Sequence, residues 1–232
     1  MKKLLNININ YIKFLNDIKD INIIKTALIL KQEKINSIKI TFKKNYKINK
    51  KKIIILKKII KTNFNFNIKI SDEILNFIIK IKPKYCCLIP ENKIVIDNDL
   101  NIIKYINKIS LLTNLLNNNG IKVSVFINPD LNQIDAAINA GCNSIELNTK
   151  IYSLSTNSLE KKYNFNKIKK AAYYANKKGL IVNVVCGINY DNIKKISKIK
   201  EINEININYS IINSSIIIGL KKAIKNILLL IN

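Results

Sequence analysis

Short apolar runs alternate with longer segments of helical periodicity along the whole chain. The runs predict strands at Leu4–Ile9, Ser37–Phe42, Phe64–Ile68, Tyr85–Ile89, Ile121–Ile127, Ser144–Leu147, Leu180–Val185 and Glu204–Ile207. The longer segments predict helices at Ile21–Gln32, Lys50–Ile60, Asp72–Ile81, Leu100–Asn118, Leu131–Ala140, Phe165–Lys178, Asp191–Ile199 and Ser214–Ile231. This alternation is typical of βαβ units, so the sequence predicts an α/β fold, a (β/α)8 TIM barrel, with residues 1–232 as a single domain.

Glycine and proline positions agree with this division. Gly120, Gly141 and Gly179 each follow a predicted helix and precede a predicted strand, where a left-handed C-cap favours glycine. Pro129-Asp130 opens the predicted helix after Ile127. Helix ends are therefore predicted where the barrel pattern requires them.

Composition limits the function classes. The chain has a formal net charge of +25 but no histidine, arginine or tryptophan, and its lysines are spread through every segment. A biased coding pool is the favoured cause, and without a nucleic-acid motif we expect no specific nucleic-acid partner. The four cysteines lack disulfide or metal-ligand spacing, which favours a reduced, cytoplasmic compartment and no metal. No apolar run is long enough to span a membrane, and no signal peptide is predicted.

Candidate site residues follow from the fold, because TIM-barrel sites lie at the C-terminal ends of the strands. In chain order the polar or small residues there are Asn8, Asn10, Tyr11, Thr41, Lys43, Asn67, Glu91, Asn128, Glu146, Asn148, Cys186, Gly187, Asn208 and Tyr209. The set suits a small anionic molecule. Polar residues also close ordinary strands, so a single asparagine is as easily structural as functional.

The segment Pro83-Lys84-Tyr85-Cys86-Cys87-Leu88-Ile89-Pro90-Glu91-Asn92-Lys93 resembles the PHFCCLVPEK-type segment of the pyridoxine 5'-phosphate synthase family. The resemblance continues in register along nearly the whole chain, and it implies the same barrel. In the family, two phosphorylated substrates, 3-amino-2-oxopropyl phosphate and 1-deoxy-D-xylulose 5-phosphate, condense with loss of water and phosphate. It also implies a homo-oligomer and no metal or other cofactor.

The N-terminal half carries the first resemblances at the site. Residues 8–12 resemble the family's Asn-Ile-Asp-His-Ile, which matches Asn8 and replaces the aspartate and histidine by Asn10 and Tyr11. Lys19 falls at a phosphate-binding arginine. Residues 38–43, Ile-Lys-Ile-Thr-Phe-Lys, resemble Ile-Thr-Val-His-Leu-Arg, which places Thr41 at a catalytic histidine and Lys43 at a substrate-binding arginine.

Further positions follow in order. Residues 64–67 are similar to a segment ending in the catalytic glutamate, here Asn67, and residues 144–149 resemble F-I-E-I-H-T, which retains Glu146. Residues 182–187 resemble V-N-A-G-H-G, with Cys186 at a histidine proton donor and Gly187 at a phosphate contact. Residues 206–212 resemble N-I-G-H-A-I-I, with Asn208 and Tyr209 at its glycine and histidine.

Two hypotheses about function follow. The first is a divergent pyridoxine 5'-phosphate synthase in which Glu146 is the retained catalytic carboxylate. The second is a catalytically inactive barrel that binds a phosphorylated ligand or a subunit partner, because Thr41 and Asn67 cannot accept a proton at neutral pH. Cys186 could donate a proton, but a small buried apolar role is the favoured interpretation.

Overall fold

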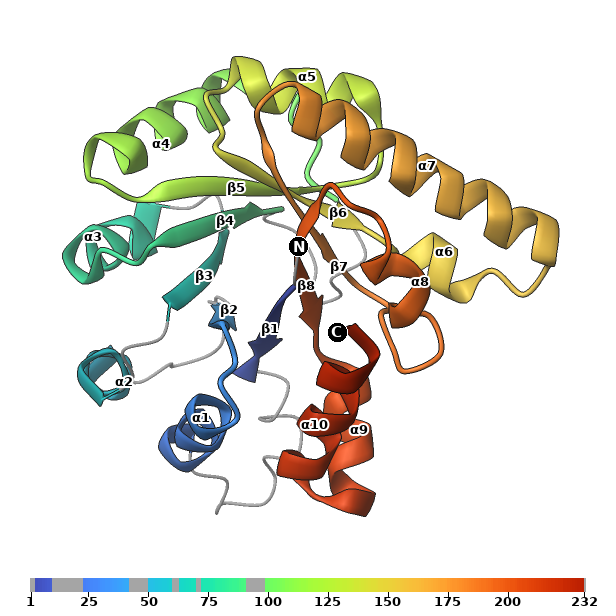
Figure 1. The fold of residues 1–232 in the computed structure, drawn as a ribbon. Coiled ribbons are helices and arrows are strands. Elements are labelled where there is room, and N and C mark those ends of the chain that lie inside the picture. The colour runs from blue at the N-terminus through green and yellow to red at the C-terminus, as the bar shows by residue number, and fades with distance from the viewer. Residues whose placement is uncertain are drawn as a thin grey trace.

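Eight parallel strands close into a barrel, each hydrogen-bonded to the next along the chain and β8 to β1 (Figure 1). The computed structural model describes residues 3–9, 23–41, 50–59, 63–69, 72–90 and 99–231. The strands are β1 Leu4–Asn8, β2 Ser37–Thr41, β3 Asn63–Lys69, β4 Tyr85–Ile89, β5 Lys122–Ile127, β6 Ser144–Asn148, β7 Ile181–Val185 and β8 Ile202–Ile207. The predicted (β/α)8 TIM barrel is confirmed.

Helices follow the strands and surround the barrel (Figure 1). They are α1 Ile23–Gln32, α2 Lys50–Ile59, α3 Asp72–Ile81, α4 Ile106–Asn118, α5 Leu131–Asn139, α6 Lys150–Leu154, α7 Ser158–Lys177, α8 Ile193–Ser197, α9 Tyr209–Ile218 and α10 Leu220–Ile231. None of the described helices combines the length and apolar character that crossing a bilayer requires.

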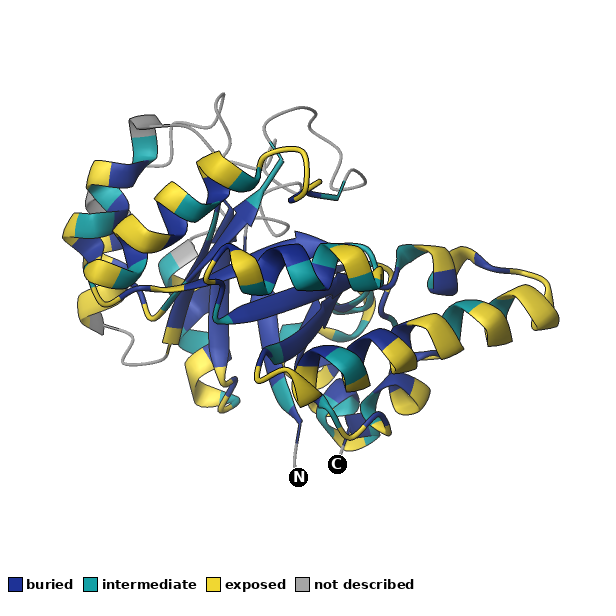
Figure 2. Cartoon of the chain, turned by 90° about the horizontal axis from the view of Figure 1, so that it is seen from above, coloured by how far each residue is buried: buried dark blue, intermediate teal, exposed yellow. Residues whose placement is uncertain are grey.

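Strand residues divide into two sets that face opposite sides of the barrel wall. One set is apolar and belongs to the main core together with helix residues, as Ile38 of β2 and Ile205 of β8 do. The alternate set is largely polar, and its members contact one another across the interior, as Lys39 and Glu146 do. Both sets are buried, and the strands are accordingly the darkest part of Figure 2. The main core therefore lies between sheet and helices, and the barrel interior is polar.

The predicted caps are confirmed. Asp130 accepts from the backbone N–H groups of Asn132 and Gln133, at 2.8 and 3.2 Å, and so begins α5. Gly120 and Gly179 have φ of +76° and +89° after α4 and α7. In this left-handed region glycine carries no side-chain penalty, which ends each helix before the next strand.

Three predicted helices differ from the structure by more than two residues at a boundary, and the short helix α6 was not predicted. Helix α4 begins at Ile106 instead of residue 100, because the Leu100 N–H donates to Phe126 O of β5 and so keeps this segment on the barrel. The helix predicted at 165–178 begins at Ser158, where the Asn157 side chain caps it. The helix predicted at 214–231 is two helices, α9 and α10, separated at Gly219.

Candidate active site in the barrel

A hydrogen-bonded triad lies at the C-terminal ends of the first three strands. Asn8 Nδ2 donates to Thr41 Oγ1 at 2.8 Å, and Asn67 Nδ2 donates to the same oxygen at 3.3 Å. A threonine hydroxyl oxygen can accept two hydrogen bonds, so both asparagine amides can bond to Thr41 at once. The structure therefore brings three predicted site residues together, with Thr41 at the centre of the group.

An ion pair crosses the barrel interior below these residues. Lys39 Nζ of β2 donates to Glu146 Oε1 of β6, and the two side chains are 2% and 5% exposed. Ser124 Oγ of β5 also lies 3.5 Å from Glu146 Oε1. Burial alone lowers the pKa of Lys39, but the carboxylates of Glu146 and Glu204 outweigh it, so the net direction is upward. Lys39 is thus an ammonium group in the middle of the barrel.

Glu204 is a second buried carboxyl group on the interior face. It accepts from Asn6 Nδ2 at 3.0 Å and from Ser37 Oγ at 2.5 Å. Burial raises the pKa of Glu204, against the opposing effects of Lys39 and of its two hydrogen-bond donors. Both carboxyl groups therefore act on the Lys39 ammonium group, and Glu146 is the one that contacts it directly.

An apolar patch lines part of the interior, apart from the main core. Cys87, Phe126 and Val185 form it, with Ile89 and Cys186 packed against them. Burial raises the pKa of the Cys87 thiol well above its usual range, so Cys87 stays neutral. The same contacts are consistent with the apolar interpretation of Cys186, although its side chain is partly exposed.

The segment after β7 has a strained and crowded backbone. Cys186 and Gly187 have φ of +74° and +70°, and the Thr149 hydroxyl donates to the Cys186 carbonyl oxygen. A Cβ placed on Gly187 would lie 1.7 Å from Ser153 Oγ. Only glycine fits here, because it tolerates positive φ and brings the backbone close to α6. A non-glycine residue at positive φ, as at Cys186, is often found at functional sites.

The last predicted residues surround the start of α9. Asn208 precedes the helix, and its Oδ1 is buried without a hydrogen-bond partner among the described residues, as is Asn67 Oδ1. Tyr209 is the first residue of α9, and it is half exposed. Buried amide oxygens that lack a donor favour a ligand with hydroxyl or ammonium hydrogens. Asn148 Nδ2 donates to Asp99 Oδ1 at 2.7 Å at the same end of the barrel.

Several predicted residues lie outside the described part of the chain: Asn10, Tyr11, Lys19, Lys43 and Glu91. Within that part no cluster of cysteine and acidic residues could hold a metal ion. The strand-end reading missed Lys39, Glu204 and Ser124, because it considered only where strands stop. The available signal at Lys39 and Ser124 was a charged or hydroxyl residue between two apolar residues in mid-strand, and Glu204, which follows Asn203, lacks that signal.

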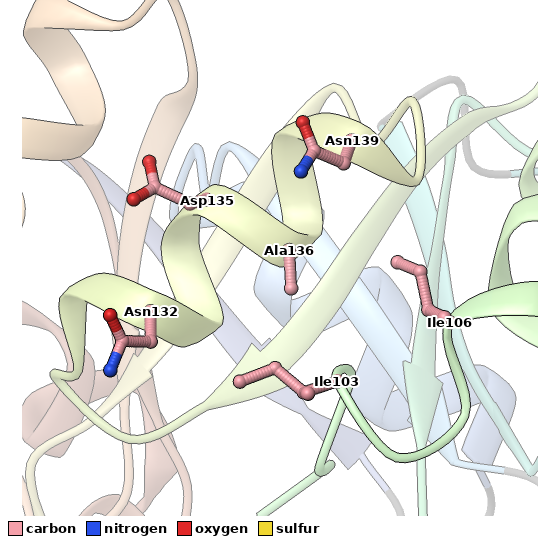
Figure 3. Close-up of a pocket in the computed structure, with 6 residues that line it drawn as sticks. All are labelled: Ile103, Ile106, Asn132, Asp135, Ala136 and Asn139. Atoms are coloured by element: carbon pink, nitrogen blue, oxygen red, sulfur yellow. The ribbon is translucent and has the colours of Figure 1, made fainter.

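A pocket of about 290 Å³ lies away from these residues, between α5 and the segment leading into α4. Figure 3 shows the side chains that line it: Ile103, Ile106, Asn132, Asp135, Ala136 and Asn139. The Asp135 carboxylate also accepts a hydrogen bond from the Tyr174 hydroxyl of α7, at 2.7 Å. None of the predicted site residues contributes to this pocket.

Comparison with known proteins identifies relatives. Residues 5–232 match the family model described as "Pyridoxal phosphate biosynthesis protein PdxJ". The chain is 36% identical to pyridoxine 5'-phosphate synthase of Blochmanniella pennsylvanica (strain BPEN), over 96% of this chain and 94% of that protein. It is 34% identical to the Blochmanniella floridana synthase, over 86% and 82%. The crystal structure of KGPDC from Streptococcus mutans superposes with a TM-score of 0.65 at 13% identity, covering 100% and 99% of the two chains.

Proposed function

The chain belongs to the PdxJ family of pyridoxal phosphate biosynthesis proteins, and from that premise we propose that it condenses 3-amino-2-oxopropyl phosphate with 1-deoxy-D-xylulose 5-phosphate to pyridoxine 5'-phosphate. The family match over residues 5–232 carries this proposal. The buried carboxylate of Glu146 in the barrel supports it, because the resemblance assigns the transition-state carboxylate to this position.

Glu146 would stabilise positive charge that develops on the reacting nitrogen and carbon atoms. In a water-poor interior an oriented carboxylate interacts more strongly with such charge than it does in bulk water. Thr41, held by the hydrogen bonds that Asn8 and Asn67 donate to its Oγ1, would contact a substrate oxygen. These roles need no histidine at position 41, although they move fewer protons than an imidazole would.

Phosphate binding would occur at the ends of β7 and β8. The backbone at Gly187 lies against α6, and α9 begins directly after Asn208. Tyr209 and Ser210 form the first turn of α9, and the N-terminal end of a helix favours an anion. Lys19 and Lys43, by resemblance, would add positive charge to the phosphate sites.

Mass spectrometry of purified protein incubated with both substrates tests the proposal. We expect pyridoxine 5'-phosphate in amounts that scale with protein concentration, and a loss of about 10²-fold or more in Glu146→Gln. Lys122→Met is a matched control, because Lys122 is exposed at the start of β5, away from the predicted site residues. Product formation no greater than the protein-free reaction, by a protein with native circular dichroism, would refute the proposed activity.

A second candidate is an inactive barrel that binds a phosphorylated ligand. The observation that favours it is the Asn67 side chain, an amide that donates to Thr41 in the place of a glutamate. A triple variant with Thr41→His, Asn67→Glu and Cys186→His distinguishes the two. An inactive scaffold with an intact pocket gains synthase activity, whereas an enzyme that uses its present residues loses it.

We also expect this chain to act in the cytoplasm as a homo-oligomer, as the resemblance implies. Light scattering coupled to size-exclusion chromatography gives the mass of the assembly directly. A mass equal to the 26.6 kDa of one chain at micromolar concentration would refute the oligomer.

A further inference from the structure

Lys39 is a departure from the family that the structure places beside Glu146. The family segment that resembles residues 38–43 has threonine where this chain has Lys39. The side chain extends from β2 into the interior, and its Nζ reaches Glu146 of β6. A lysine that replaces threonine inside a barrel brings a full positive charge into a space where an unpaired charge is strongly unfavourable. Its presence therefore calls for a role that depends on the charge.

The interior holds two acidic groups to balance that charge. Glu146 contacts the ammonium group directly, and Glu204 faces it from β8, bonded to Asn6 and Ser37. Cys87 of β4 faces the same ammonium as a neutral thiol. Burial favours the protonated, neutral form of Glu204. The positive charge of Lys39 is then compensated by the negative charge of Glu146, which it contacts.

The contacts also fix how the Glu146 carboxylate is oriented. Lys39 and Ser124 both approach Oε1, at one side of the group. No hydrogen bond between described residues reaches Oε2, so that oxygen remains to interact with a substrate. A carboxylate anchored through one oxygen keeps the geometry of the other, which is what a preorganised site needs.

We propose that Lys39 is a positioning residue for Glu146: its ammonium group anchors Oε1, so that Oε2 faces the reacting centre. This inference rests on the proposed function for the identity of the reaction, but the ion pair itself can be tested without turnover. Lys39 acts through Glu146 and forms no bond to substrate. As an ammonium group it has no lone pair for attack on a ketone.

The first experiment measures the ion pair by NMR of protein labelled with ¹³C at lysine Cε. The signal of Lys39 is assigned by its absence in Lys39→Met. In Glu146→Gln the direct partner is gone and Glu204 remains to oppose the burial effect, so we expect the proton affinity of Lys39 to fall at least about 10-fold, a fall of one pKa unit. Lys122→Met serves as control and leaves the Lys39 signal unchanged. An unchanged Lys39 titration in Glu146→Gln would overturn the proposal.

The second experiment separates positioning from a structural role by comparing kcat with KM. In Lys39→Met the Glu146 carboxylate loses its anchor, so kcat should fall more than about 10-fold while KM changes less than about 2-fold. Lys39→Arg keeps the charge and should retain more of the wild-type kcat than Lys39→Met does. An unchanged kcat in Lys39→Met would overturn the positioning role.

Two further results complete the test. The double variant Lys39→Met/Glu146→Gln keeps the interior neutral, so it should fold even if Lys39→Met alone does not. Borohydride treatment in the presence of 1-deoxy-D-xylulose 5-phosphate should leave Lys39 unmodified, and a reduced adduct on Lys39 would overturn the proposal in favour of a nucleophile. If the wild type has no synthase activity, the proposed function alone fails, and the NMR titration still decides whether the pair exists.

Discussion

Gly187→Ala tests whether the segment after β7 is as tightly packed against α6 as the structure indicates. The added Cβ would lie 1.7 Å from Ser153 Oγ and 2.5 Å from Ser153 Cβ. Rotation of the serine side chain relieves the first contact but breaks the bond from Ser153 Oγ to Lys150 O, 2.7 Å long. The second contact involves the Cβ atom itself, so no rotamer relieves it and the backbone must shift.

The magnitude combines three effects. An alanine at a φ of +70° costs about 1–2 kcal/mol. Overpacking against Ser153 adds about 1–3 kcal/mol, and loss of the hydrogen bond to Lys150 adds about 0.5–1.5 kcal/mol. We therefore expect Gly187→Ala to lower the free energy of unfolding by about 3–6 kcal/mol, measured by urea denaturation followed by circular dichroism.

Two matched variants isolate the steric part. Gly120 has a φ of +76° with no atom within 4 Å of the added Cβ, so Gly120→Ala should cost only the backbone part, about 1–2 kcal/mol. In a Ser153→Gly background, Gly187→Ala should cost about as much as Gly120→Ala, because both clashing atoms are gone. If Gly187→Ala and Gly120→Ala are equally destabilising, or if Ser153→Gly brings no relief, the close packing is refuted.

Three other predictions concern charge and reactivity. Burial raises the pKa of Glu204 above its ordinary value of 4.5, so the unfolded chain releases this proton at a lower pH than the folded chain does, and the free energy of unfolding falls as pH rises above 4.5. Urea denaturation between pH 5 and 8 should show a smaller fall of that free energy in Glu204→Gln than in the wild type. Identical pH slopes for the two proteins would contradict the prediction. Lys3 Nζ donates to the carbonyl oxygens of three residues, 199, 200 and 202; Lys3→Met should cost about 1–3 kcal/mol by the same assay, whereas Lys198→Met, on an exposed lysine, should cost less than about 0.5 kcal/mol. Burial raises the pKa of Cys142 to about 11, and Cys186 is the only one of the four thiols that is partly exposed; a thiol reagent at pH 7.5 should label one thiol quickly in native protein, and none in Cys186→Ser.

The fold could be predicted from the sequence because its signals are local. Strand β4 was predicted at the observed residues, since an apolar run between two prolines leaves little choice of boundary. Helix α7 was predicted too late, although Asn157 and Glu160 are a recognisable start signal for a helix. Helix α4 was predicted too early, because the bond from Leu100 to Phe126 depends on the tertiary structure and leaves no local pattern.

The candidate site could be predicted only in part. Reading strand ends found Thr41 and Asn67, and the structure joins them by a hydrogen bond. It could not find the partner of Glu146, because Lys39 is 107 positions away and belongs to a strand on another side of the barrel. Pairing across a closed sheet depends on strand order and stagger, which the apolar pattern leaves undetermined.

A physical rule nevertheless makes such a partner predictable once the barrel is accepted. Lys39 and Glu146 each stand between apolar residues in mid-strand and share a face with polar residues two positions away, whereas Glu204 stands between Asn203 and Ile205. A parallel barrel covered by helices buries both faces of its strands, so a charged residue in mid-strand is buried on either side. An isolated buried charge is too unfavourable to persist, so these groups must meet or become neutral. With one cation and two acids, the rule requires one ion pair and one protonated acid. The pH dependence of the free energy of unfolding in Glu204→Gln, compared with the wild type, decides whether Glu204 is that acid.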